Sequence, residues 1–89
     1  MTARRFAPAR AIAVTTDPAT GQPTGLRWRG RAERVARIEA AWSSDTDWWA
    51  GVQGGVRRRY VRVLTQGGLL CVAYCDMTDG RWYLEAIVD

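Results

Sequence analysis

Apolar and polar residues alternate over the C-terminal part of the chain, from Arg57 to Val88. The alternation recurs in three segments, RRRYVRVLTQ, GLLCVAYCDM and DGRWYLEAIV, with short glycine-bearing turns between them. A period of two with many β-branched and aromatic residues is typical of half-buried β-strands. We therefore predict three consecutive antiparallel strands here.

The two turns between these segments determine which residues share a face of the sheet. Asp79-Gly80 is a strong signal for a β-hairpin. Gln66-Gly67-Gly68 fits a loop of two or of three residues, and the choice inverts one strand relative to the next. Because a two-residue loop would set two arginines beside apolar residues of the last segment, we expect a three-residue loop with glycine in the left-handed conformation.

A three-residue loop predicts one apolar face and one mixed face for this sheet. The apolar face, which we expect to be the core, holds Val61, Val63, Cys71, Ala73, Cys75, Trp82, Leu84, Ala86 and Val88. The mixed face holds Arg58, Tyr60, Arg62, Tyr74, Asp76, Arg81, Tyr83 and Glu85, with Leu64, Leu70, Val72 and Ile87 toward one end.

The N-terminal part of the chain carries weaker patterns. Residues 1–10 are predicted to form a flexible basic arm. Residues 11–16 (AIAVTT) are β-branched enough for a first strand, and residues 17–25 form a loop because they hold two prolines and two glycines. Residues 26–29 alternate apolar and basic side chains, which predicts a short second strand. We expect a single small β domain over residues 11–89.

Residues 31–42 (RAERVARIEAAW) fit two structures. Val35, Ile38 and Trp42 lie at i, i+3 and i+7, and alanine and glutamate are good helix formers, so the local pattern favours a helix. A strand that carries a bulge would also fit Val35 and Ile38.

The composition is that of one small folded domain. A chain of 89 residues with 47% hydrophobic residues and five tryptophans has enough apolar surface for a core. No stretch approaches the ~20 apolar residues of a membrane helix. The N-terminus lacks the apolar region of a signal peptide. We therefore expect a cytoplasmic protein that does not enter a membrane.

The net charge of +4 comes from thirteen arginines and no lysine. Such a balance favours polyanionic partners through non-specific attraction. A GC-rich genome, which uses arginine where others use lysine, is the simpler explanation of the missing lysines. The positive charge holds under both explanations.

No residue pattern indicates catalysis or a cofactor. Histidine, the commonest general acid and base, is absent, and no phosphate-binding loop or nucleophile motif occurs. Cys71 and Cys75 on one strand would lie about 13 Å apart, too far for a disulfide. Without histidine they form no zinc site. We expect a non-enzymatic protein with two free thiols and neither cofactor nor metal.

The mixed face suggests a surface that binds nucleic acid. Tyrosines at similar height on adjacent strands would stack on bases, at roughly 1–3 kcal/mol per base, while arginines hold phosphates. The candidates are Arg58, Tyr60, Arg62, Tyr74, Arg81 and Tyr83. Two structural alternatives are cross-strand pairs of these arginines with Asp76 and Glu85, and coverage of this face by residues 11–42.

Trp48 and Trp49, in a polar and glycine-rich segment, are candidates for a protein interface. Neighbouring side chains of an extended segment point to opposite sides. One tryptophan is therefore expected to fill the core and the other to be exposed, and exposed tryptophan is typical of interface hot spots. In the alternative, an irregular loop packs both.

Several short strings occur together along the chain: RWRGR at 27–31, DWW at 47–49, RRYVRV at 58–63, LCVAYCD at 70–76 and GRWYLEAIVD at 80–89. Over residues 11–89 the chain resembles an uncharacterised small bacterial domain, found as a short stand-alone protein in actinobacteria and the Deinococcus–Thermus group. A similar pattern ends the ImuB-like relatives of Y-family DNA polymerases.

The resemblance implies both a local structure and a biological context. Relatives carry more aromatic and β-branched residues at positions matching 31–42, which implies a bulged strand there. ImuB-like proteins act in damage-induced mutagenesis alongside an error-prone polymerase subunit, and their C-terminal regions are associated with partner contacts. A stand-alone copy would be a detached module that binds a polymerase partner, DNA or both.

Together these observations predict an antiparallel all-β domain of five or six strands, closed or half-closed into a barrel-like sheet with a C-terminal three-stranded meander. The expected function is that of a non-enzymatic accessory interaction module, associated with DNA repair or translesion mutagenesis and acting through protein contacts. Direct nucleic-acid binding by the mixed face is the alternative, and a small-ligand-binding or enzymatic domain is a third. Monomer and dimer are both left open.

Overall fold

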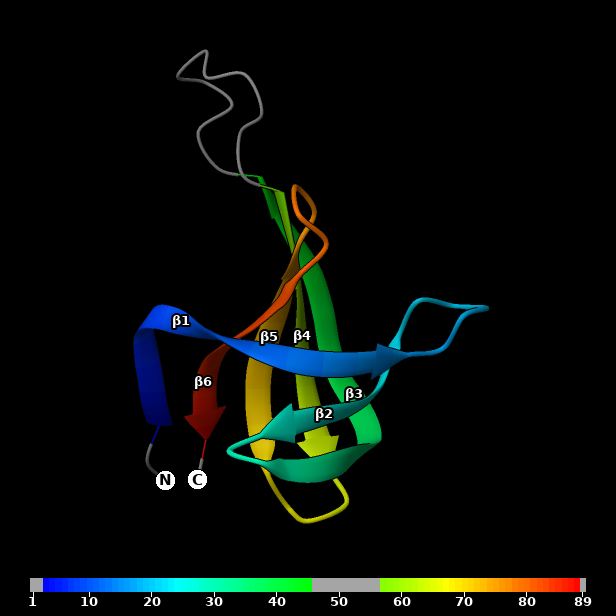
Figure 1. Ribbon diagram of the computed structural model, residues 1–89, viewed down its shortest axis with the longest axis vertical. Helices are drawn as coiled ribbons and strands as arrows, with labels where there is room; N and C mark the ends of the chain where they lie inside the picture. The colour runs from blue at the N-terminus through cyan, green and yellow to red at the C-terminus, as the bar shows by residue number, and fades with distance from the viewer. Residues whose placement is uncertain (1–2, 46–56, 89) are drawn as a thin grey trace.

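The computed structural model describes residues 3–45 and 57–88 and contains six strands (Figure 1). They are β1 (Ala3–Thr16), β2 (Pro23–Trp28), β3 (Arg31–Asp45), β4 (Arg57–Thr65), β5 (Leu70–Asp76) and β6 (Trp82–Val88). Each strand pairs antiparallel with its neighbours in the order β1-β2-β3-β4-β5-β6, and β6 pairs with β1, so the barrel is closed. The predicted all-β antiparallel fold is confirmed.

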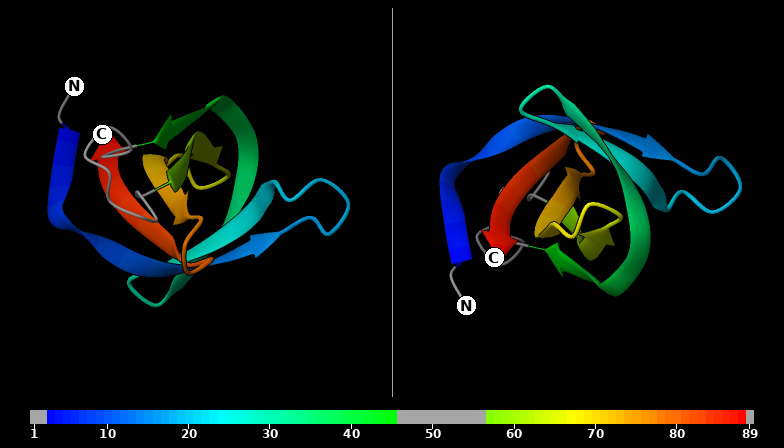
Figure 2. Two further views of the ribbon diagram at one scale, coloured as in Figure 1. Left: turned by 90° about the horizontal axis from the view of Figure 1, so that it is seen from above. Right: turned by 90° about the horizontal axis from the view of Figure 1, so that it is seen from below.

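Two long strands, β1 and β3, close the barrel because each pairs with two neighbours in turn. β1 pairs with β6 between Ala3 and Ile12, and then with β2 from Ala13 onward. β3 pairs with β2 through its first four residues and with β4 from Val35 onward. Viewed from above and below, the strands therefore form a ring (Figure 2).

Residues 3–10, for which a flexible arm was expected, belong instead to β1. Ala3, Arg4 and Arg5 pair with Val88, Ile87 and Ala86 of β6, and the ring of Phe6 packs against the core. The segment shows no apolar alternation because Phe6 is its single large apolar residue. Its position is set by pairing with β6, whose edge would otherwise present unpaired backbone N–H and C=O groups.

Residues 31–42 form a bulged strand, so the helix that the local pattern favoured is wrong. The register of β3 against β4 shifts between Val35 and Arg37 and again between Ile38 and Ala40. Each bulge adds one residue to the strand. Val35 and Ile38 therefore both pack against the core although three positions separate them. The first bulge thus produced the helix-like spacing of Val35 and Ile38, whereas Trp42 pairs with Tyr60 and does not pack against the core cluster.

The turns of the C-terminal meander agree with the prediction. Thr65 N donates to the carbonyl of Leu69 at 2.8 Å around the three-residue loop, and Gly68 has a φ of +89°. The Oγ1 of Thr65 also accepts a hydrogen bond from Leu69 N at 3.0 Å. The hairpin expected at Asp79-Gly80 is also present, but Asp76 N donates to the carbonyl of Arg81 at 2.9 Å. Its loop therefore spans residues 77–80, which pairs Tyr74 with Tyr83.

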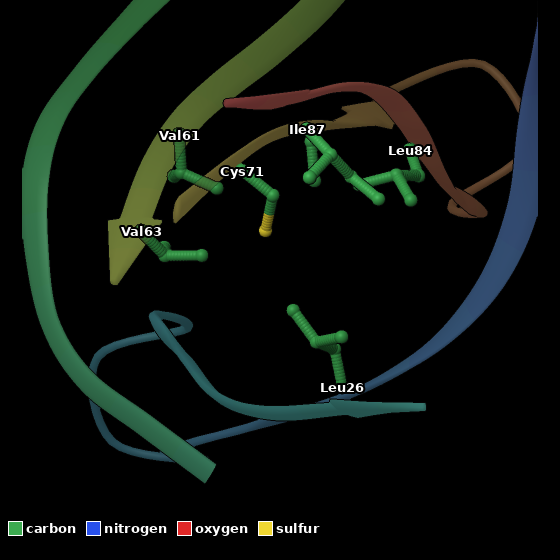
Figure 3. Close-up of a cluster of buried hydrophobic side chains, with 7 residues drawn as sticks. Leu26, Val61, Val63, Cys71, Leu84 and Ile87 are labelled. Carbon is green, nitrogen blue, oxygen red and sulfur yellow. The ribbon is translucent and has the colours of Figure 1, made fainter. Parts of the chain in front are cut away.

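The core lies inside the barrel and contains most of the residues predicted for the apolar face (Figure 3). Leu26 of β2 points across the interior toward side chains of β4, β5 and β6 (Figure 3). The buried cluster consists of Leu26, Val61, Val63, Cys71, Ala73, Leu84 and Ile87. Cys75, Trp82 and Val88, also predicted for the core, are only half-buried.

Ile87 was predicted for the mixed face and lies in the core instead. The register of β5 against β6 shifts after Leu84, so that Glu85 is an extra residue and Ile87 pairs with Cys71. Beyond this bulge the faces of β6 are exchanged, which places Ile87 inward and pairs Val88 with Leu70. A bulge leaves no mark in the alternation of a seven-residue strand.

Candidate functional site

Four aromatic rings form a continuous row across the outside of the barrel. Trp42 of β3 stacks on Tyr60 of β4, with ring centroids 5.4 Å apart and an interplanar angle of 1°. Tyr60 lies 5.2 Å from Tyr74 of β5, which lies 5.3 Å from Tyr83 of β6. The three tyrosines thus lie at one height, which is the condition that the stacking hypothesis requires. Trp42 extends this aromatic row, and sequence reasoning missed it because the register of β3 was open.

Arg58 covers the middle of the aromatic row. Its Cζ lies 4.6 Å from the ring centroid of Tyr74, and its Nη1 donates a hydrogen bond of 3.4 Å to the hydroxyl of Tyr60. This hydrogen bond raises the pKa of Arg58. Tyr74 is only 7% exposed, and this burial raises its pKa. The ring faces contact one another and Arg58, so a base stacks on Tyr74 only after Arg58 has moved.

The cross-strand ion pairs considered for the mixed face are not among those that the described residues form. Glu85 lies 4.0 Å from Arg5 of β1, not beside Arg62. Asp76 pairs with Arg58 in the β4–β5 register, but its carboxylate accepts from Thr78 N at 2.8 Å. The Nε atoms of Arg58 and Arg62 are buried and have no hydrogen-bond partner among the residues described.

The remaining two candidates of the mixed face lie at the β5–β6 turn. Arg81 is exposed and follows Gly80. The hydroxyl of Tyr83 donates to the Asp79 carboxylate at 3.1 Å, and this hydrogen bond raises the pKa of Tyr83. The described strands make their main contacts with their neighbours in the ring, so residues 11–42 do not form a layer over this face.

A cavity of about 480 Å³ lies at the end of the barrel where the β1–β2 loop faces β3. Ile38, Val61 and Trp82 contribute apolar side chains to its wall. The exposed large hydrophobic residues of the described chain, Trp42 at 44% and Met77 at 49%, both line it. The cavity therefore places exposed apolar surface around a recess.

One edge of β3 beside this cavity has no strand partner. β2 pairs with β3 only as far as Arg34, whereas β4 pairs with β3 as far as Asp45. Ala40, Ala41, Trp42 and Ser43 are all exposed. Within the described strands, this part of β3 thus offers backbone groups on one side.

Trp48 and Trp49, the residues predicted for a protein interface, lie outside the described residues.

Both cysteines are free, and burial raises the pKa of Cys71 to about 11. No group of three or more His, Cys, Asp or Glu residues able to hold a metal occurs in the described ranges. Nor do those ranges form a helix long and apolar enough to cross a membrane.

These features define a small closed antiparallel β-barrel with an aromatic row outside and an apolar recess. The recess lies beside a strand edge that no other described strand pairs with. The chain belongs to a family described as a domain of unknown function, DUF6504, whose model matches residues 3–89. No curated protein and no solved structure matches the chain.

Proposed function

We propose that this protein is a non-enzymatic accessory module that binds an extended segment of a partner protein along the free edge of β3. One observation carries the proposal: the unpaired edge and the apolar recess occur at the same place. Ala40–Ser43 lack a partner on one side among the described strands, and Ala41, Trp42 and Ser43 line the cavity.

The edge of β3 supports binding by strand addition. Unpaired N–H and C=O groups of a strand edge are a template for an incoming strand. In such complexes the main-chain hydrogen bonds supply affinity, and pockets for alternate side chains supply specificity. Residues Ala40–Ser43 carry no charge that would oppose pairing, and the nearby Arg37 and Glu39 neutralise each other at 2.7 Å.

The recess supports the insertion of an apolar side chain from the partner. Its volume of about 480 Å³ lies within the range of ligand pockets, roughly 300–1,000 Å³. Tryptophan and methionine are enriched at the centres of protein interfaces. Burial of Trp42 and Met77 by the inserted segment would remove from water the largest exposed apolar side chains of the described residues.

The resemblance to the C-terminal segment of ImuB-like proteins supports a partner from a DNA-repair or translesion polymerase complex. Under this proposal the chain contributes a docking surface to that complex and performs no reaction of its own.

Selection of a random peptide library on the immobilised protein tests the peptide site. We expect extended sequences with alternate apolar residues, and a bound peptide should shift the amide NMR signals of Ala40–Ser43. Trp42→Ser and Met77→Ser are each expected to weaken binding by about tenfold or more. Thr78→Ser is the matched control, since Thr78 is exposed beside Met77 but does not line the recess. Peptides that bind the Trp42→Ser and Met77→Ser variants as tightly as the wild type would contradict the proposal.

Direct nucleic-acid binding by the mixed face is the second candidate function. It is favoured by the guanidinium groups of Arg58 and Arg62, which form no ion pair with a carboxylate of the described residues. Movement of Arg58 onto a phosphate would uncover Tyr74 for stacking. Arg58→Gln and Arg62→Gln should then lower the affinity for a labelled oligothymidylate, measured by fluorescence anisotropy. Equal affinity of both variants and the wild type would exclude this face.

A further inference from the structure

We propose that a second surface, built by β1 and the β2–β3 turn, binds the phosphate backbone of a nucleic acid. The surface consists of two aromatic rings and three arginines, Phe6, Trp28, Arg4, Arg10 and Arg29, and is referred to as the arginine cluster. It shares no residue with the peptide site on β3 or with the mixed face. The inference therefore goes beyond the proposed function and does not depend on it.

The aromatic rings hold the three guanidinium groups in place. Phe6 and Trp28 lie 5.2 Å apart between ring centroids, and both are half-buried and packed against the core. The Cζ atoms of Arg4 and Arg10 lie 5.9 and 5.4 Å from the centroid of Phe6. The Cζ of Arg29 lies 5.2 Å from the centroid of Trp28. A cation–π contact orients a guanidinium without using its N–H donors, so these donors are available to a ligand.

The cluster also lies in the most strongly basic part of the chain. Residues 3–31 carry six arginines and a single acidic residue, Asp17. Arg5 pairs with Glu85 and Arg37 with Glu39, and the arginines of the cluster form no ion pair with another described residue. The surface thus carries positive charge that no carboxylate of the described chain neutralises by direct contact, which attracts a polyanion.

The chemistry of the cluster fits a nucleic-acid backbone better than a membrane or a protein. Membrane-surface and protein interfaces use exposed apolar anchors. Here the rings are half-buried beneath guanidinium groups, and the exposed large hydrophobic residues of the described chain line the recess on the far end of β3. Phosphate oxygens accept most hydrogen bonds in protein–DNA complexes, and arginine is a principal donor.

The backbone of Arg29 is a second, independent observation. Arg29 and Gly30 form the two-residue turn between Trp28 and Arg31, with φ values of +52° and +75°. A turn with two positive φ angles favours asparagine, aspartate or glycine at its first position. Arginine is an uncommon choice there, and backbone strain of this kind clusters at functional sites. The presence of arginine at this position is therefore explained by a role of its side chain and not by the backbone conformation of the turn.

Fluorescence anisotropy with a labelled oligothymidylate and a labelled duplex tests the proposal. The association constant of the wild type should fall with salt, and each arginine of the cluster changed to glutamine should reduce the slope of log K against log salt by about 0.7 on the single strand or 0.9 on the duplex. Arg37→Gln is the control for charge, because Arg37 is paired with Glu39. The triple variant of Arg58, Arg62 and Arg81 to glutamine tests the mixed face in the same assay.

Arg29→Asn separates binding from folding. Asparagine suits the turn better than arginine does, so the melting temperature should stay the same or rise while the affinity falls.

Four results would overturn the proposal. Two concern the cluster itself: no anisotropy change with either probe at about 50 mM salt, or wild-type affinity in the variant that lacks all three arginines of the cluster. The other two are loss of binding only in the mixed-face variant, and binding to phosphatidylserine vesicles without binding to either probe. None of these results bears on peptide binding, which Trp42→Ser tests separately.

Discussion

Burial in the barrel raises the pKa values of both cysteine thiols. Cys71 is fully buried in the core, and its thiol has a pKa raised to about 11 by that burial and, to a smaller degree, by the charge of Glu33. Cys75 is half-buried, and its pKa is also raised, chiefly by burial. Since the thiolate is the reactive form, burial keeps both thiols protonated near neutral pH. Both cysteines are free, as expected from the sequence.

Alkaline unfolding is expected to report the burial of Cys71. In the unfolded chain the thiol loses its proton near pH 9, whereas in the folded protein it keeps the proton up to about pH 11. The unfolded state therefore binds fewer protons in this window, and the free energy of unfolding should fall as the pH rises, by roughly 2–3 kcal/mol for this group. Urea denaturation at pH 8 and pH 11 measures the fall.

The Cys71→Ala variant is the control for alkaline unfolding. It is less stable at both pH values because it leaves a cavity, but it should lose less stability between them. Tyr74, whose pKa is likewise raised by burial, accounts for part of the fall that remains. An equal fall in the variant and the wild type would mean that Cys71 does not carry the effect.

Turns and bulges decide the geometry of the individual strands. The loop after β4 was predictable because a two-residue alternative would have buried arginines, and Gly68 takes the left-handed conformation that a three-residue loop requires. The bulge of β6 was not predictable in the same way, and the bulged strand at 31–42 was implied by the family resemblance while the local pattern favoured a helix. A bulge depends on how two strands accommodate each other, and the residue it adds, such as Glu85, need not differ from its neighbours.

The Gly68→Ala variant isolates the conformational demand of the β4–β5 loop. A Cβ at Gly68 would meet no atom within 4 Å, so its cost comes from the φ of +89° alone. We expect a loss of about 1–2 kcal/mol in the free energy of unfolding, by urea titration. Gly67→Ala is the comparison, because the nearest atoms to its Cβ would belong to the flexible carboxylate of Glu33. A larger loss at Gly67 than at Gly68 would argue against the three-residue loop.

Closure of the barrel is a property of the whole molecule, and it depends on the first residues of the chain. β1 is the strand that joins β6 to β2, through pairs that begin at Ala3. Without these pairs one edge of the C-terminal meander would be open to solvent, and the ring of Phe6 would leave the core. Residues 3–10 therefore stabilise the fold as well as carrying two arginines of the arginine cluster.

Deletion of residues 2–9 is expected to destabilise the protein by at least about 2 kcal/mol, the order of one buried phenylalanine side chain. The amides of Ala86 and Ile87, which pair with β1, should exchange with solvent faster than those of Val61 and Val63 in β4. Chemical denaturation and hydrogen exchange followed by NMR measure the two effects. A truncated protein as stable as the full chain is the result that a flexible arm predicts, and it would contradict the closed barrel.

The amino-acid sequence by itself determined the three C-terminal strands, their turns and the inward placement of Val61, Val63, Cys71, Ala73 and Leu84, because alternation and turn chemistry are local properties. It also placed Tyr60, Tyr74 and Tyr83 on one face. Only the tertiary structure decided that Trp42 stacks on Tyr60, that Ile87 turns inward and that three arginines contact Phe6 and Trp28. It also decided that an edge of β3 beside the recess is left unpaired by the other described strands. Each of these depends on contacts between residues far apart in the chain, through strand pairing and bulges that no local pattern encodes.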